Sequence, residues 1–132
     1  GSSSVVIIIN YKYIYNKPKY FINRGTKMIK ISFEEIILLA LSFNPSEIIL
    51  QNIDRESSFE GLDKSILSYY PKDSKLPLVI SGGCNSKEEA IDVLKNTEVN
   101  GIAIGSLFCL FGKYKTPLVN HQFNLWNSND IM

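Results

Sequence analysis

Val5-Val6-Ile7-Ile8-Ile9 is an unbroken run of β-branched, apolar residues near the start of the 132-residue chain. Apolar and polar residues do not alternate in it, so both faces of the predicted strand should be buried, as in a parallel sheet. Three further short apolar runs follow, at residues 47–51, 76–80 and 101–104. We therefore predict four parallel strands, of which the run at 5–9 is the first.

The segments between these runs carry helical patterns. A capping box of Ser32 and Glu35 predicts the start of a helix over residues 33–43, and Asn44-Pro45 predicts its end. The face of this helix that we expect to be buried consists of Ile36, Ile37, Leu39, Ala40, Leu41 and Phe43.

Two more helices complete the alternation. Residues 62–70 predict a short helix that is capped near Asp63 and ends before Pro71, and a second capping box at residues 86–89 opens a helix over 90–95. Strands that alternate with helices in this way imply right-handed parallel βαβ units. The predicted fold class is α/β, with four parallel βα units.

Residues 11–31 interrupt this alternation. Tyr13, Tyr15 and Tyr20 alternate with other residues around Asn16-Lys17-Pro18, which predicts a protruding β-hairpin after the first strand. The aromatic rings could serve as a stacking platform for nucleic-acid bases. We prefer the structural interpretation, because aromatic residues form strands well and stabilise hairpins through cross-strand pairs.

Composition and charge narrow the class of protein. The length allows one compact domain, which we place at residues 5–120, with a polar tail at 121–132 and a cloning remnant at 1–4. A net charge of +1 gives no general attraction to nucleic acid or an anionic membrane. No apolar run approaches the roughly 20 residues that span a bilayer, no signal peptide precedes the first strand, and two cysteines suit a reducing compartment. We expect a cytoplasmic protein without nucleic-acid or membrane partners.

Polar residues and glycines follow the predicted strands at their carboxyl ends, where parallel α/β folds bind ligands. Glycine lets the backbone approach a ligand, and N–H groups at helix starts favour an anion. Two successive glycine-bearing strand ends, each leading to a helix, therefore predict a phosphate clamp. The residues at the strand ends are Asn10, Lys12, Asn52, Asp54, Glu56, Ser57, Ser81, Gly82, Gly83, Cys84, Gly105 and Ser106.

Some of these residues also have a structural interpretation. Asp54 and Arg55 are expected to pair and to shape their loop, whereas Lys12 either attracts an anion or is a solvated side chain. Cys84 has no matched histidine and is expected to be a small filler rather than a nucleophile. His121 is the only histidine and lies in the tail. We therefore expect no catalytic triad, no histidine-rich metal site and no cofactor.

Several of these motifs resemble one known family. The loop NIDRESSFEGLD at 52–63 is similar to the loop SIDRDGTxxGYD of the cyclase subunit of imidazole glycerol phosphate synthase. Residues 80–83 resemble its ASGGAG turn, residues 104–108 resemble its AGSLF turn, and VVIIINYK at 5–12 resembles VVVSIDVK, which opens the second half of that barrel. The ending FGKYKTPLVN is similar to a subfamily from bacterial surface-polysaccharide clusters, whose chains end in GKHRAVLINYP.

The resemblance implies half of a (β/α)8 TIM-type barrel, because a whole barrel needs about 250 residues. In that family each half carries one phosphate site, and both together bind a phosphorylated, sugar-like substrate. The implied phosphate site here comprises Gly82, Gly83, Gly105 and Ser106, with Ser57 near it and Ser81, Asp54 and Lys12 in supporting positions. The family also implies a glutaminase partner that supplies ammonia and, in the polysaccharide subfamily, an amidine product.

Two positions depart from the family pattern. The catalytic Asp at the end of the first strand of this half is Asn10, and an amide cannot exchange a proton as a carboxyl group can. Asn10 could still orient a substrate by hydrogen bonding. The Asp-Gly of the loop is Glu56-Ser57, which leaves Asn10 and Glu56 at the catalytic positions and removes one flexible backbone position. The other catalytic Asp of the family belongs to the first half, so we do not expect cyclase turnover by this chain alone.

Two functions are open at this point. One is an enzyme half that is active only with a first-half barrel and a glutaminase. The other is a non-catalytic half-barrel that binds phosphate or serves as an assembly subunit. Asn10 favours the second, and the glycine turns agree with both. Because the strands at 5–9 and 101–104 would be unprotected apolar edges, we expect self-association, as a homodimer that closes a pseudo-complete barrel.

Overall fold

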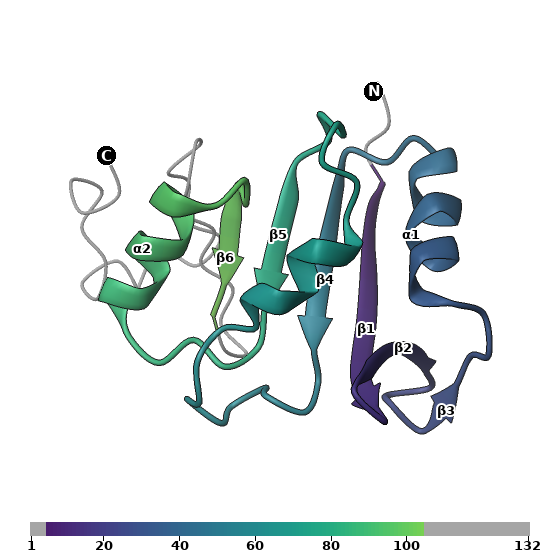
Figure 1. The fold of residues 1–132 in the computed structure, drawn as a ribbon, viewed down its shortest axis with the longest axis horizontal. Coiled ribbons are helices and arrows are strands. Elements are labelled where there is room, and N and C mark those ends of the chain that lie inside the picture. Colours follow the sequence, from purple (N-terminus) through teal and green to yellow (C-terminus); the bar gives the residue numbers. More distant parts are fainter. Residues whose placement is uncertain (1–4, 105–132) are drawn as a thin grey trace.

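The computed structural model describes residues 5–104, which form one mixed sheet with helices packed against it (Figure 1). The strands are β1 (Val6–Ile14), β2 (Lys17–Ile22), β3 (Lys27–Met28), β4 (Glu47–Asn52), β5 (Leu78–Ser81) and β6 (Gly101–Ala103). The helices are α1 (Phe33–Ser42), the 3-10 helix η1 (Lys64–Tyr69) and α2 (Lys87–Asn96). The predictions for residues 1–4 and for the tail at 121–132, including His121, concern residues outside the described range.

The sheet has the strand order β3-β2-β1-β4-β5-β6, and β1, β4, β5 and β6 run parallel. Ile8 pairs with Ile49, Ile49 with Val79, and Val79 with Gly101. Paired residues of neighbouring strands share one face of a sheet, and successive residues of a strand alternate between faces. The predicted α/β class with parallel βα units is therefore confirmed, and the register assigns each strand residue to a face.

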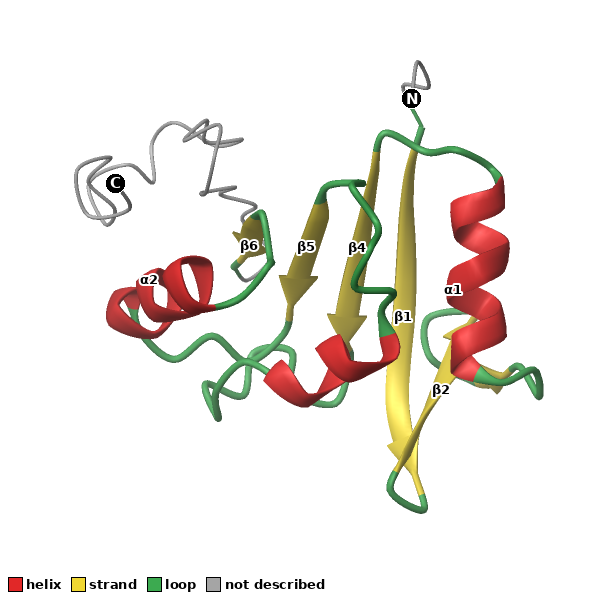
Figure 2. Ribbon diagram, turned by 45° about the horizontal axis from the view of Figure 1, so that its top comes forward, coloured by secondary structure: helices red, strands yellow, loops and turns green. Residues whose placement is uncertain are grey.

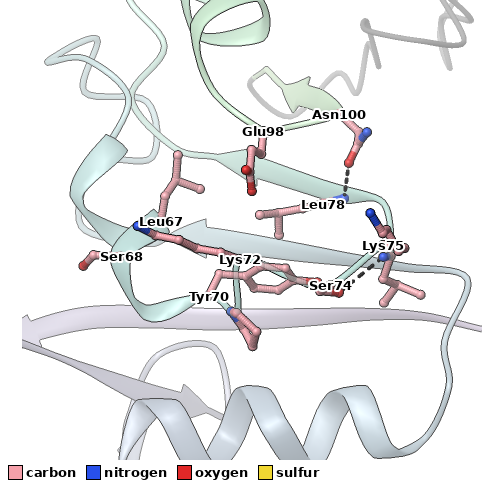
Figure 3. Close-up of a pocket in the computed structure, with 11 residues that line it drawn as sticks. Leu67, Ser68, Tyr70, Lys72, Ser74, Lys75, Leu78, Glu98 and Asn100 are labelled. Carbon is pink, nitrogen blue, oxygen red and sulfur yellow. Dashed lines mark hydrogen bonds between the residues drawn. The ribbon is translucent and has the colours of Figure 1, made fainter.

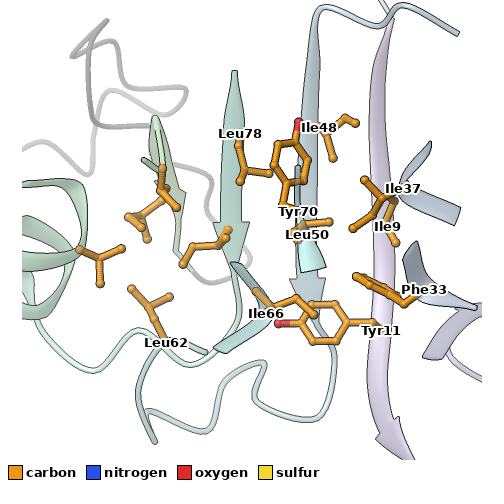
Figure 4. Packing of buried hydrophobic residues seen from close by; sticks show 14 of the residues in the cluster. Ile9, Tyr11, Phe33, Ile37, Ile48, Leu50, Leu62, Ile66, Tyr70 and Leu78 are labelled. Atoms are coloured by element: carbon orange, nitrogen blue, oxygen red, sulfur yellow. The ribbon is translucent and has the colours of Figure 1, made fainter. Parts of the chain in front are cut away.

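The main core lies between the sheet and its helices. Ile9, Leu50 and Leu78 project from three neighbouring strands towards Ile37 of α1 and Ile66 of η1 (Figure 4). Burying an aliphatic side chain of this size contributes about 1.5–3 kcal/mol, so this layer accounts for the association of the helices with the sheet. The opposite face of the sheet carries a separate small cluster of Ile49, Val79 and Ala103. We call this opposite surface the inner face.

The hairpin forms because β1 continues beyond the parallel sheet. Residues 11–14 of β1 pair antiparallel with residues 17–20 of β2, and the connecting Tyr15 and Asn16 both adopt positive φ angles. Figure 2 shows this turn projecting past the ends of β4 and β5. The predicted hairpin is confirmed, although Tyr15 is 97% exposed at the turn rather than part of a cross-strand pair. Because β2 pairs with residues 11–14, the edge of β1 opposite β4 is open only before Tyr11, which includes the predicted edge at 5–9.

The helix caps follow the sequence closely, but the buried face of α1 does not. The Ser32 and Ser86 hydroxyls each accept the N–H group three residues later, as expected of N-caps. On α1, Leu39 and Phe43 are 54% and 69% exposed, so their predicted burial is wrong. Phe33, Ile36, Ile37 and Ala40 cover the sheet instead. The predicted helix before Pro71 is present as a 3-10 helix with Asp63 as its cap.

Candidate functional site

The register brings one polar residue from each of three strands into a single row on the inner face. Asn10 pairs with Gln51, and Gln51 pairs with Ser81. The preceding row on the same face is apolar and contains Ile8, Ile49 and Val79. The inner face thus changes from apolar to polar at the carboxyl ends of the strands, where parallel α/β proteins bind ligands. We call Asn10, Gln51 and Ser81 the polar row.

Asn10 carries an unsatisfied acceptor at this position. Its Oδ1 atom is buried and accepts no hydrogen bond from the part of the chain that the structure describes. A buried polar atom without a partner costs about 1–3 kcal/mol, so native proteins rarely retain one without a reason. A ligand that donates a hydrogen bond would satisfy this atom.

Lys12 follows Asn10 on the same face of β1 and is held by the hairpin. Its Nζ atom lies 5.0 Å from the centroid of the Phe21 ring, within the range of a cation–π interaction. The side chain is half-buried, so it is not a freely solvated lysine. The positive charge thus lies over the Phe21 ring, on a residue two positions beyond Asn10 on the same face of β1.

Gly82 and Gly83 are required by the geometry of the turn that follows β5. Their φ angles are +105° and +93°, in the region that favours glycine. A Cβ atom on Gly82 would collide with the backbone oxygen of Asn52, and one on Gly83 would collide with the backbone oxygen of Gly61. The Gly61 N–H donates to the Gly83 oxygen at 2.6 Å. The glycine turn is therefore packed directly on the loop after β4.

The loop after β4 divides into structural and exposed residues. Asn52 is buried, and its Oδ1 atom accepts the N–H groups of Asp54 and Arg55 at 3.1 and 3.2 Å. The Arg55 guanidinium donates to the Gly61 oxygen at 2.9 Å, so Arg55 shapes the loop as expected, but through this carbonyl rather than through Asp54. Asp54, Glu56 and Ser57 are exposed.

The polar row and the loop are thus two different environments. The structure brings Asn10 and Ser81 together in one row, with Lys12 further along the same strand face. It gives no side-chain hydrogen bond that joins Asp54, Glu56 or Ser57 to this row within residues 5–104. Gly105 and Ser106 lie outside the described residues. Gln51 was missed by the sequence analysis, although its spacing of two residues from Ile49 places it on the inner face.

Asp63 is the most heavily hydrogen-bonded side chain near the site. Its Oδ2 atom accepts the hydroxyl groups of Tyr11 at 2.9 Å and Tyr13 at 2.6 Å, and its Oδ1 atom accepts the N–H group of Ser65 at 3.1 Å. Asn52 contributes a longer contact of 3.4 Å to Oδ2. We call these residues the Asp63 network. It joins β1, β4 and η1 behind the polar row.

The network shifts the pKa of each of its titratable members. Burial alone would raise the pKa of Asp63, but hydrogen bonds from Ser65, Tyr13 and Tyr11 outweigh burial and hold this pKa below its usual value. Burial, followed by the hydrogen bond to Asp63, raises the pKa of Tyr13 to about 12. Burial and the nearby Asp63 charge raise the pKa of Tyr11 as well. At neutral pH the carboxylate is therefore ionised and both tyrosines are donors.

Glu89 links the segment after β5 to the loop after β4 through hydrogen bonds. Its two carboxylate oxygens accept the N–H groups of Asn85 at 2.9 Å and Leu62 at 2.8 Å. Cys84, between these segments, is buried in the main core, and burial raises the pKa of its thiol. A protonated, enclosed thiol fits the predicted filler role. Within residues 5–104 there is no group of three or more histidine, cysteine, aspartate or glutamate side chains that could hold a metal ion.

A family model described as "Histidine biosynthesis protein" matches residues 1–115. This match covers most of the chain and includes every strand and helix described above. The chain belongs to the histidine biosynthesis protein family. The predicted resemblance to the cyclase subunit of imidazole glycerol phosphate synthase is thereby confirmed at the level of the family, and so is the TIM-barrel type of its fold.

Individual relatives agree with the family assignment. A Leptospira interrogans protein, provisionally named as imidazole glycerol phosphate synthase subunit HisF, is 33% identical over 123 residues, which are 92% of this chain and 48% of that protein. Imidazole glycerol phosphate synthase subunit HisF of Dictyoglomus turgidum is 32% identical over 120 residues, 90% of this chain and 47% of that protein. The chain thus spans about half the length of the curated relatives it matches.

Membership of the histidine biosynthesis protein family gives the polar row a context. TIM-type barrels build their active sites at the carboxyl ends of the strands, which is the end where the polar row and the glycine turn lie. A separate observation concerns membranes. Among the described residues of this family member, no helix is long and apolar enough to cross a membrane.

Proposed function

We propose that this chain supplies the second half of a HisF-like cyclase barrel and binds the phosphate group of a sugar-like small molecule at the carboxyl ends of its strands. The observation that carries the proposal is the buried, unpartnered Oδ1 atom of Asn10 in the polar row. Sugar hydroxyl groups are donors, and such a group would satisfy this acceptor. Gln51 and Ser81 offer further hydrogen-bonding groups in the same row.

The glycine turn and Lys12 are suited to the phosphate group. Gly82 and Gly83 directly follow Ser81, and backbone without side chains lets an anion approach closely. Lys12, two residues after Asn10 on the same face of β1, adds a positive charge at this end of the strand. Gly105 and Ser106 would complete this site, with Ser57 at its border, as the family resemblance implies. Asp54 supports this site by helping to shape the loop after β4, through its N–H group on Asn52, and not by contacting the ligand.

Asn10 decides what chemistry this half can supply. An amide can orient a substrate but cannot act as a general acid or base. Glu56 stands where the family's loop has the Asp of its Asp-Gly pair, and it is exposed. In the complete assembly, a first-half barrel would provide the remaining acid–base group, and a glutaminase subunit would supply ammonia. Cyclase chemistry or amidine formation for a surface polysaccharide would then follow, in the cytoplasm.

The apolar surface of the chain supports a partner that closes the barrel. Val6 and Ile8 on β1 are 45% and 46% exposed, and Leu38, Leu39 and Phe43 expose apolar surface on the neighbouring helix α1. Val6 and Ile8 belong to the inner face and α1 packs on the opposite face, and exposed apolar side chains on each of them mark interaction surfaces. The chain covers 48% of the Leptospira relative, so a complete barrel of that length would contain a further half of similar size. The partner is a first-half barrel or a second copy of the chain.

Phosphate binding is tested by amide NMR on the 132-residue chain. Inorganic phosphate and ribose phosphate should give saturable shifts at Gly82, Gly83 and Ser81, whereas ribose alone should bind far more weakly. Lys12→Gln should weaken phosphate binding, and Lys27→Gln, an exposed change on β3, should not. A folded spectrum without shifts at the glycine turn would show that the turn is only structural.

The non-catalytic alternative is favoured by Asn10 and has its own test. Light scattering at micromolar concentration should give a particle larger than one chain, and Ile8→Lys should reduce its size. The chain is then mixed with a separately expressed first-half barrel and a glutaminase. Turnover that rises on Asn10→Asp would support the enzyme half, and phosphate binding without turnover in any mixture would support the non-catalytic half-barrel.

A further inference from the structure

A cavity lies on the helical side of the sheet, at the opposite end of the strands from the polar row. Its volume is about 520 Å³, and Leu78, the first residue of β5, and Asn100, just before β6, line it. The polar row contains Ser81, which is the last residue of β5. The length of β5 therefore separates this cavity from the candidate phosphate site.

Pro71 explains why the cavity exists. The 3-10 helix η1 ends at Tyr69, and the Tyr70 N–H caps it by donating to the Leu67 oxygen at 3.1 Å. Proline has no N–H group and clashes with a preceding helical turn, so the helix cannot continue. Residues 71–77 instead form a loop that turns at Ser74, whose N–H donates to the Pro71 oxygen. This loop leaves open space above Leu78.

Tyr70 gives the cavity an unsatisfied donor. The residue lines the cavity and is only 9% exposed, and its hydroxyl oxygen is buried without a hydrogen-bond partner among the described residues. Burial raises the pKa of Tyr70, and the nearby side chain of Ser74 opposes this rise. The Ser74 oxygen already accepts the Leu76 N–H at 3.3 Å. Within residues 5–104 the structure gives the Tyr70 hydroxyl no acceptor.

The other lining groups define what the acceptor should be. Figure 3 shows Tyr70 and Lys72 on one side of the cavity and Glu98 and Asn100 on the other. Leu67, Leu76 and Leu78 supply apolar surface. The exposed charges are two lysines, Lys72 and Lys75, and one glutamate, Glu98, which leaves one net positive charge at the rim.

We propose that this cavity binds a small organic anion with an apolar body, of the monocarboxylate class. The carboxylate accepts the Tyr70 hydroxyl and faces the lysines, and the hydrocarbon covers the leucines. Glu98 disfavours a multiply charged ligand, which distinguishes this site from the phosphate site. The volume is in the range of small-molecule pockets, about 300–1,000 Å³. This proposal does not depend on the proposed function.

Hexanoate is the probe, titrated into the 132-residue chain and followed by amide NMR. We expect saturable shifts at Tyr70, Leu78 and Asn100 and none at Gly82 and Gly83. Acetate, which lacks the body, and hexanol, which lacks the charge, should each bind at least about fivefold more weakly, the factor for roughly 1 kcal/mol. Equal binding of hexanol, or shifts only at the glycine turn, would overturn the proposal.

Tyr70→Phe separates a ligand-binding hydroxyl from a structural one. Because the hydroxyl is unpartnered, its removal should leave the urea midpoint of unfolding unchanged or raise it, while hexanoate binding weakens about fivefold or more. Lys75→Gln should also weaken binding, and Lys95→Gln, on the exposed part of α2, should not. A lower midpoint for Tyr70→Phe, or unchanged hexanoate binding in it, would contradict the proposal.

Discussion

The hydroxyl group of Tyr11 donates a hydrogen bond of 2.9 Å to Asp63, which lies 52 residues further along the chain. Tyr11 is the residue of β1 that follows Asn10, and Asp63 caps η1. This bond therefore links the strand that carries the candidate site to the helix that covers the next strand. Because successive strand residues face opposite sides, the Asp63 network supports Asn10 from behind.

Asp63→Ala should lower the free energy of unfolding by about 2–4 kcal/mol, because it leaves the buried Tyr11 hydroxyl without its acceptor and removes the cap of η1. The affected donors are the hydroxyl groups of Tyr11 and Tyr13 and the backbone of Ser65. Urea denaturation measures the loss. Asp73→Ala, in an exposed loop, should change stability by less than about 0.5 kcal/mol. Equal effects of the two substitutions would show that the network is not stabilising.

Asp63 should also make stability depend on pH. Its pKa is lowered in the folded chain, so its contribution is present above its unfolded pKa of about 3.9 and is lost as pH falls through the lower folded value. The unfolding free energy should therefore decrease below about pH 4. In Asp63→Asn this part of the acid dependence should be absent, which chemical denaturation at a series of pH values would detect.

Glu47 should make stability depend on pH in the opposite direction, because its pKa is raised rather than lowered. It pairs with Val6 at the amino end of β4, and burial raises its pKa. Its ionised form is thus unfavourable in the folded chain, and the cost disappears as the group protonates on acidification. Glu47→Gln should raise the urea midpoint at pH 7, with a smaller gain below about pH 4. Glu60→Gln, at an exposed position, is the control and should leave the midpoint unchanged.

Ser57→Gly should stabilise the chain by roughly 1 kcal/mol, because Ser57 adopts a φ angle of +63° that glycine accepts without strain. The family motif has glycine at this position, so the substitution restores the residue that the backbone conformation favours. Thermal unfolding measures the gain. Glu56→Gly is the matched control, since Glu56 is not among the residues with positive φ, and it should not stabilise.

Gly82→Ala should be much more damaging than Gly25→Ala. Both glycines have positive φ angles, but the Cβ added at Gly82 meets the backbone of Asn52, whereas at Gly25 it meets the end of the flexible Ile53 side chain at 2.7 Å. We expect a loss of more than about 2 kcal/mol at Gly82 and a smaller loss at Gly25, by urea denaturation. Similar losses at both positions would contradict the close packing of the glycine turn.

Local patterns in the sequence predicted the elements of the fold. The four apolar runs are parallel strands, and the Ser32 and Ser86 caps lie where the capping boxes predicted them. These features depend on neighbouring residues, so they can be read from a short window. The exposure of Leu39 and Phe43 was not predictable in this way, because helical periodicity does not say how wide the covered stripe is.

The candidate site was predicted less completely than the fold. The strand-end positions identified Asn10, Ser81 and the glycine turn, since carboxyl ends of parallel strands share one edge. The Asp63 network was missed because its tyrosines and its carboxylate are about 50 residues apart and no local pattern connects them. Tyr70 was missed because an unpartnered hydroxyl is visible only once its surroundings are known.

The length of β1 has a consequence for how the chain folds. Residues 11–14 of β1 pair with β2 across a two-residue turn. Residues 6–11 pair with β4, which comes later in the chain, after the whole of α1. Local hairpins form in microseconds, while pairing between distant segments is slower. The hairpin should therefore be the earliest structured part of the sheet, and β4 is added to the other edge of β1 afterwards. Hydrogen exchange during refolding should protect Tyr20 before Leu50.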